Sequence, residues 1–214
     1  MTNTSTRLAG AGALAFGVLT FAGFFLANPP GSTYNASDVA NYLANGHRVL
    51  AITGMYLGWL AILGLVGLLA HLRTVIDAGK SIAARIFWGT GLAAAASFAA
   101  GWCVTGGQVI AHLEGGKTMI VAPPVTQLIG ELGVLLIFGS GSALLGLGLI
   151  ALTLATRTAI PAWLRWLTLV AGLCGLAGPA FFTFFLLLLW AITFGLWLLA
   201  GGRDSAAALR APTI

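Results

Sequence analysis

Long apolar runs dominate this chain, and five short breaks carrying proline, glycine or charge separate them. A run of about 20 apolar residues is long enough to cross the hydrocarbon core of a bilayer as a helix. Within lipid, a helix satisfies its own backbone hydrogen bonds. The sequence therefore predicts an all-α polytopic membrane protein, a six-helix transmembrane bundle forming a single domain over residues 1–214. The expected helices cover 8–27, 49–72, 86–111, 125–155, 162–178 and 181–200.

The composition excludes an ordinary soluble fold. Charged residues make up 7% of the chain and hydrophobic residues 59%, whereas about one quarter of a soluble domain is charged. The net charge of +5 comes from single basic residues at the ends of apolar runs, so it does not indicate nucleic-acid binding. The expected partner is the lipid bilayer. An apolar outer surface is also compatible with contact to a second copy of the chain or to another membrane protein.

The first apolar run, 8–27, follows a single positive charge at Arg7 and so resembles a secretory signal. It is long enough to span a bilayer. The segment from Phe24 to Pro29 lacks the small residue that signal cleavage prefers at position minus three. We therefore expect this run to be retained as the first helix.

The last apolar block, 162–200, is too long for one crossing. As a single helix it would measure about 58 Å at about 1.5 Å per residue, nearly twice the hydrocarbon thickness. Gly178 and Pro179 stand near its middle and supply a turn signal. The block is therefore predicted to form two short helices.

The positive charges predict the orientation in the membrane. Cytoplasmic loops carry an excess of Lys and Arg. With the N-terminus inside, only Arg48 and Lys117 fall outside, and both termini are cytoplasmic. The predicted location is the bacterial plasma membrane. Eight basic residues then lie inside: Arg7, Arg73, Lys80, Arg85, Arg157, Arg165, Arg203 and Arg210.

The two longest connections, 28–48 and 112–124, lie on the predicted outer side. Within the first, the segment from Ser37 to Leu43 has helical apolar spacing and a serine suited to an N-cap. We expect a short helix there, near the membrane surface.

Small residues recur at spacings that let helix backbones approach closely. Gly54 and Gly58 are four residues apart, as are Ala13 and Gly17. Three glycines recur along the fifth run, at 172, 175 and 178. We expect these positions to pack helices within the bundle rather than to form a dedicated dimer interface.

Polar residues inside the spanning segments point to a candidate site at the outer helix ends. An ionisable residue within a transmembrane helix is costly and needs a reason. Glu131 and Gln127 are four residues apart on the fourth run, and Thr105 begins a polar strip on the third. The predicted topology brings one cluster to a common depth: His47, Arg48, Gln108, His112, Gln127 and Glu131.

Three interpretations of this cluster compete. In the structural interpretation, Glu131 pairs with Arg48 or Lys117, and the cluster only fixes how the outer helix ends align. In the transport one, Glu131 and the histidines form a protonatable or cation-attracting entrance for a small solute or ion. In the third, His47 and His112 ligate a metal or haem in a redox subunit. No metal-binding motif accompanies these histidines, so we expect neither a metal nor a cofactor.

Catalytic signatures are absent from the sequence. It contains no phosphate-binding glycine loop and no paired acidic motif suited to metal-assisted transfer. The segment from Gly139 to Ser142 resembles a nucleophile elbow, but it falls within a predicted membrane helix. We identify no catalytic residue, which favours a structural, regulatory or solute-handling role over an enzyme.

Four segments resemble a bacterial membrane family, domain of unknown function 4386. They are Arg7 to Gly10, the outer loop leading to His47 and Arg48, Ile160 to Leu164, and Leu187 to Trp190. The likeness extends over most of the chain as a layout of hydropathy with a few loop residues. It implies a six-helix inner-membrane protein, and it brings no assigned functional residues.

Overall fold

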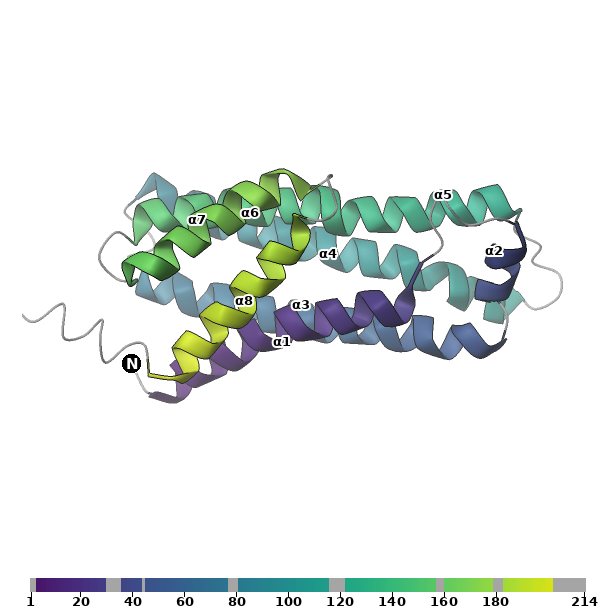
Figure 1. Cartoon of the computed structure of the whole chain (residues 1–214), viewed down its shortest axis with the longest axis horizontal. Coiled ribbons are helices and arrows are strands. Elements are labelled where there is room, and N and C mark those ends of the chain that lie inside the picture. The colour runs from purple at the N-terminus through teal and green to yellow at the C-terminus, as the bar shows by residue number, and fades with distance from the viewer. Residues whose placement is uncertain are drawn as a thin grey trace, which may run out of the picture.

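The structure is a computed structural model that describes residues 3–29, 36–43, 45–76, 81–115, 122–156, 160–178 and 183–201. Throughout these ranges the secondary structure is helical, without a strand, which confirms the predicted all-α class. The helices run roughly along one axis and pack side by side (Figure 1). In chain order they are α1 (Asn3–Ala27), α2 (Ala36–Leu43), α3 (Asn45–Val75), α4 (Ile82–Gly115), α5 (Pro123–Val134), η2 (Leu135–Gly141), α6 (Ser142–Ala155), α7 (Ala162–Leu176) and α8 (Phe184–Leu199).

Four helical segments of the described chain are long and apolar enough to cross a membrane. They are Thr4–Ala27, His47–Thr74, Ile82–Glu114 and Pro124–Ala155. The last is one continuous rod made of α5, η2 and α6. Each segment contains the matching predicted run and extends it by a few residues, because polar residues at the helix ends continue the backbone hydrogen bonding beyond the apolar part.

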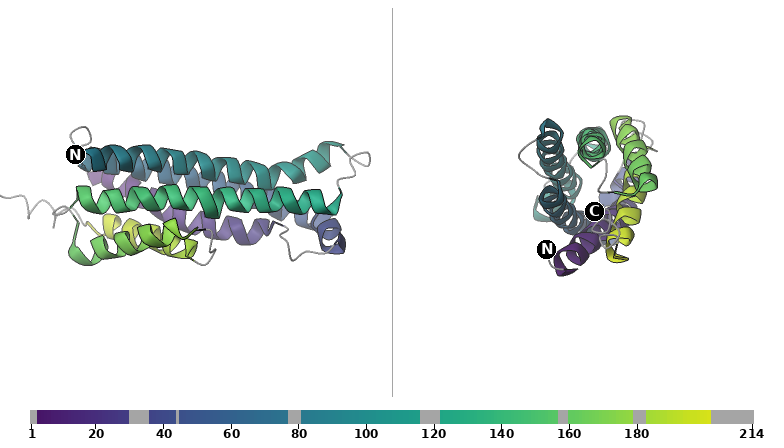
Figure 2. Two further views of the ribbon diagram at one scale, coloured as in Figure 1. Left: turned by 90° about the horizontal axis from the view of Figure 1, so that it is seen from above. Right: turned by 90° about the vertical axis from the view of Figure 1, so that its left-hand side faces the viewer.

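The two C-terminal helices are separate but short. α7 has 15 residues and α8 has 16, so each is about 22–24 Å long against a hydrocarbon core of about 30 Å. The predicted ranges, 162–178 and 181–200, contain these two helices, and residues 179–182 lie outside the described residues. Figure 2 shows that this pair lies along only one half of the bundle, whereas α3, α4 and α5 continue past it to α2.

Close approaches between glycines hold the helices together. A Cβ on Gly12 would lie 2.6 Å from the carbonyl oxygen of Gly64, and one on Gly23 would lie 2.8 Å from that of Gly54, so α1 and α3 touch backbone to backbone. On the other side of the bundle, a Cβ on Gly172 of α7 would lie 2.9 Å from the carbonyl oxygen of Gly146. The small-residue positions therefore pack helices within the chain, as predicted.

Aromatic side chains fill the middle of the bundle. Phe138 lies edge-on to Phe184, with ring centroids 4.5 Å apart, and Phe16 lies 5.6 Å from Phe98. Trp102 is 1% exposed and occupies the space that the missing side chain of Gly58 leaves. These rings form an aromatic layer across the bundle at the level where the α7–α8 pair ends.

The η2 segment is a π-helical stretch inside the long rod. A π-turn adds a residue to the helical repeat and therefore rotates the faces of the two halves relative to each other. Hydroxyl groups bridge it to its neighbours. Ser97 of α4 donates to the carbonyl oxygen of Leu136 at 2.9 Å, and Ser142 donates to the carbonyl oxygen of Gly175 on α7 at 3.0 Å.

The α1–α3 contact predicts different effects for alanine at two glycines of α3. We expect Gly64→Ala to lower the stability by about 1–3 kcal/mol, because its methyl group would press on the backbone of Gly12. Gly67 has no atom within 4 Å of its virtual Cβ, so Gly67→Ala is expected to be neutral or slightly stabilising. Thermal unfolding in detergent measures both. Equal midpoints for the two variants would contradict backbone contact as the basis of this packing.

Candidate functional site

The candidate site lies where the long helices extend past the α7–α8 pair. We call this the α2 end of the bundle, because α2 packs there against α3 and α5. The first turns of α3 and α5 and the last turns of α4 complete it. It therefore brings together the elements on which the sequence had placed its polar residues.

Four of the residues at the α2 end have buried polar atoms for which the described part of the chain supplies no hydrogen-bond partner. Both amide atoms of Gln108 are of this kind, as are Nδ1 of His112, Nε2 of His47 and Oγ1 of Thr126. Buried polar groups in native proteins nearly always have a partner, which is protein, ordered water or ligand. We call these four residues the polar cluster.

The helix register shows that the cluster has two levels. A Cβ on Gly133 of α5 would touch Thr105 of α4, which sets these residues side by side. Seven residues outward from this contact lie His112 on α4 and Thr126 on α5, so they share one level. Gln108 lies four residues deeper than His112, about 6 Å further into the bundle. The cluster is therefore arranged along the bundle axis.

His47 joins the outer level from α3. A Cβ on Gly106 would collide with Met55, which registers α4 against α3. Six residues outward from this contact are His112 and Val49, and His47 lies two residues beyond Val49. The two histidines thus approach the same level from neighbouring helices.

Helix α2 covers the cluster from the side. Tyr42 is 3% exposed and belongs to a small apolar group with Ala51 and Val109. Its ring lies 4.9 Å from the imidazole of His47. The short helix predicted from 37–43 is therefore present, and Tyr42 packs it against the imidazole of His47.

The cluster is closed on its inner side. The Thr105 hydroxyl, one turn deeper than Gln108, donates to the carbonyl oxygen of Trp102 at 3.1 Å. The indole of Trp102 then begins the aromatic layer. Polar side chains therefore line the interior from the α2 end inward as far as Thr105. Deeper than Thr105, aromatic rings fill the interior.

The structure separates the six residues predicted from sequence into two groups. His47, Gln108 and His112 belong to the polar cluster. Arg48, Gln127 and Glu131 are half-buried at the same end but are not among the residues with unsatisfied buried atoms. Lys117, which the sequence offered as a partner for Glu131, lies outside the described residues.

The π-helical segment explains why Glu131 lies off the interior face. An unbroken α-helix would place Glu131 and Gln127 on the same face as Phe138, seven and eleven residues away. The observed interior face of α5 is shifted by one residue, to Thr126, Gly130 and Gly133, all buried. Thr126 was not predicted, because a threonine is an ordinary residue within an apolar helix.

The histidines are not part of a multi-ligand metal site within the part of the chain that the structure describes. No group of three or more His, Cys, Asp or Glu side chains is close enough there to hold a metal ion. Structural and catalytic zinc sites need at least three protein ligands. The polar atoms of the cluster instead form a mixed set of an amide, two imidazole nitrogens and a hydroxyl, which suits hydrogen bonding.

Comparison of the chain with protein-family models, with curated proteins and with solved structures found no match.

Two threonines of similar burial predict the state of the cluster. Thr126→Val removes a hydroxyl that has no hydrogen-bond partner among the described residues, so we expect the stability to stay the same or to rise. Thr168→Val removes the hydroxyl to which Trp190 Nε1 donates at 2.9 Å and is expected to cost about 1 kcal/mol or more. Thermal unfolding of both variants in detergent checks this. A loss of stability in Thr126→Val would mean that its hydroxyl has a protein partner.

Proposed function

We propose that the chain is a six-span plasma-membrane protein with both termini in the cytoplasm and the α2 end outside. Two observations support this. Gly10 near the start of α1 packs against Leu199 at the end of α8, so the chain enters and leaves the bundle at one end. Among the described basic residues, Arg7, Arg73, Arg85 and Arg165 belong to helix ends opposite to α2, and only Arg48 belongs to the α2 end.

We infer that the α2 end binds a small solute carrying several hydrogen-bonding groups. The buried polar atoms of Gln108, His112, His47 and Thr126 carry this inference. Leaving a buried donor or acceptor unsatisfied costs about 1–3 kcal/mol. A protein that only needed to join helix ends would gain stability by using apolar side chains there. A bound solute with its associated water satisfies these atoms.

The charges at this end favour a neutral or cationic solute. Asp38, Glu114 and Glu131 are carboxylates at the α2 end, and Arg48 is the opposing cation among the described residues. The carboxylates still outnumber the cations when Lys117 is counted from the sequence. An anionic solute would therefore meet net repulsion.

Binding from the outer side is the activity proposed, and transfer across the membrane would require a further motion. The aromatic layer of Trp102, Phe98 and Phe138 lies between the cluster and the inner half. A solute at Gln108 can reach the inner side only if these rings move. The polar cluster is thus the outer binding site of a solute-handling protein.

Single cysteines test the proposed topology. In a background with Cys103→Ala and Cys174→Ala, we expect Ser37→Cys and Ala177→Cys to react with a membrane-impermeant maleimide on intact cells. Ser81→Cys should react only after permeabilisation. Ala177 is exposed at the end of α7. Labelling at this position therefore distinguishes an α7–α8 pair that crosses the membrane from a hairpin that enters it and returns to the inner side. Labelling of Ala177→Cys only in permeabilised cells would contradict six spans.

The three histidines test whether the cluster is accessible to solvent and solute. Diethyl pyrocarbonate acylates imidazole nitrogens that solvent reaches, and mass spectrometry locates the product. We expect His47 and His112 to react in the purified protein, whereas His71, 6% exposed at the opposite end, should react at least tenfold more slowly. Equal protection of all three would contradict a hydrated binding site.

The same reaction tests solute binding. Low millimolar urea and glycerol represent small neutral amides and polyols, and we expect at least one of them to slow the acylation of His47 and His112. Gln108→Leu should abolish that protection while the protein remains folded. Thr193→Val, which removes an exposed hydroxyl that donates to the carbonyl oxygen of Leu189 within α8, serves as the control and should retain it.

A further inference from the structure

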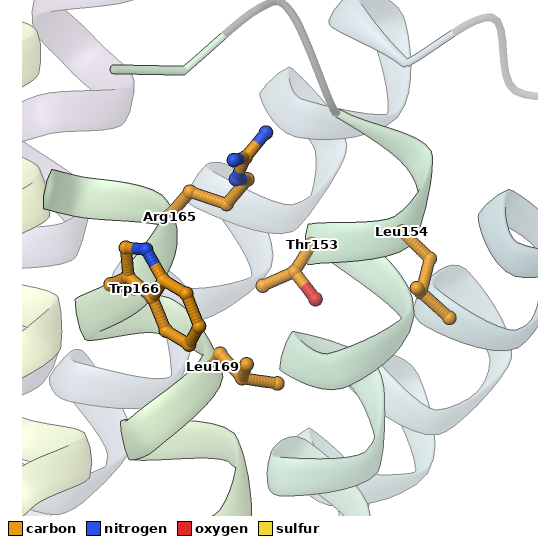
Figure 3. Close-up of a pocket in the computed structure, with 5 residues that line it drawn as sticks. All are labelled: Thr153, Leu154, Arg165, Trp166 and Leu169. Carbon is orange, nitrogen blue, oxygen red and sulfur yellow. The ribbon is translucent and has the colours of Figure 1, made fainter. Parts of the chain in front are cut away.

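A groove lies between α6 and α7 at the end of the bundle opposite to α2. Its volume is about 330 Å³, and it is lined by Thr153, Leu154, Arg165, Trp166 and Leu169. Figure 3 shows α6 on one side, with Thr153 and Leu154, and α7 on the other, with the remaining three residues. The groove is distinct from the polar cluster in position, helices and residues.

The walls of this groove suit a hydrocarbon chain. Leu154 is 58% exposed and Trp166 is 63% exposed, and both belong to helices whose outer surface is apolar. In a membrane such side chains contact acyl chains rather than water. The tryptophan near the end of α7 is also typical of the interface between hydrocarbon and headgroups.

Arg165 gives the groove a charged end. Its side chain is half-buried and extends from α7 toward the end of α6, above Trp166 and Leu169 in the view of Figure 3. A guanidinium group binds phosphate through two parallel N–H donors. The Thr153 hydroxyl donates to the carbonyl oxygen of Ile150 at 2.7 Å, and Arg165 is the charged side chain among the five residues that line the groove.

We propose that this groove binds one anionic phospholipid, with the headgroup phosphate on Arg165 and an acyl chain along Leu154, Trp166 and Leu169. A cation at one end of an apolar groove on the lipid-facing surface matches that ligand in charge and in shape. The assignment to the inner leaflet rests on the proposed topology. The binding itself does not, because the groove and its arginine are the same in either orientation.

Native mass spectrometry of the purified protein measures the binding. Phosphatidylglycerol is titrated against phosphatidylcholine, and we expect the anionic lipid to bind more tightly. Arg165→Gln keeps most of the side-chain volume and should weaken phosphatidylglycerol binding by about fivefold, the effect of one basic residue at an anionic membrane surface. Binding of phosphatidylcholine should change little.

Arg85→Gln is the matched control. Arg85 is an exposed arginine that does not line the groove and belongs to the end of α4 opposite to α2. We expect Arg85→Gln to bind phosphatidylglycerol as the wild type does. Leu154→Ala tests the acyl-chain contact without altering charge and should weaken the binding of both lipids. Because Leu154 is exposed, this variant is expected to fold even if Arg165→Gln does not.

Three outcomes would overturn the proposal. Equal binding of the two lipids would show that the arginine does not select a charge. An equal loss in Arg165→Gln and Arg85→Gln would show diffuse attraction to a basic surface. Displacement of the lipid by inorganic phosphate, or a dimer mass without bound lipid, would assign the groove to a free anion or to a second copy. Topology labelling that contradicts six spans would leave the lipid result unaffected.

Discussion

Backbone contact between helices is the constraint on which the rest of this structure depends. In lipid, burying apolar side chains gives little drive for helices to associate, so close van der Waals packing must hold them. Gly12 with Gly64 and Gly23 with Gly54 bring α1 within backbone distance of α3. The same kind of contact fastens α7 to α6 at Gly146 and Gly172. These contacts fix the helix register, and the register decides which polar residues meet at the α2 end.

The bundle divides into two parts with different chemistry. Near the α7–α8 pair, interdigitated rings fill the centre, and the buried Trp190 has its N–H satisfied by Thr168. Toward α2, buried polar atoms of Gln108, His112 and Thr126 have no hydrogen-bond partner among the residues that the structure describes. Such atoms gather at the α2 end, on three neighbouring helices, and this gathering supports a binding role there more than any single residue does.

Much of the fold could be predicted from sequence because apolar runs of membrane length admit few structures. The short helix at Ala36–Leu43 followed from its own apolar spacing, although Ser37, proposed as its cap, lies inside the helix. His47, Gln108 and His112 were singled out because they are polar residues inside apolar helices. Tyr42 and Thr126 did not follow, because each is an ordinary residue in its local sequence. Their role comes from tertiary packing, which brings α2 and the interior face of α5 against the histidines.

The π-helical segment shows why local periodicity misplaces part of a site. Extending the interior face of α6 outward by an unbroken α-helical repeat reaches Glu131, the residue that the sequence favoured most. Within Leu135–Gly141 the repeat changes, and the interior face beyond it moves to Thr126 and Gly130. Gly139, Ser140 and Gly141 lie within this stretch, and the carbonyl oxygen of Leu136 accepts from Ser140 of the same helix and from Ser97 of α4. Local and tertiary hydrogen bonds therefore meet where the repeat changes. The π-turn therefore determines whether a carboxylate or a hydroxyl faces the polar cluster.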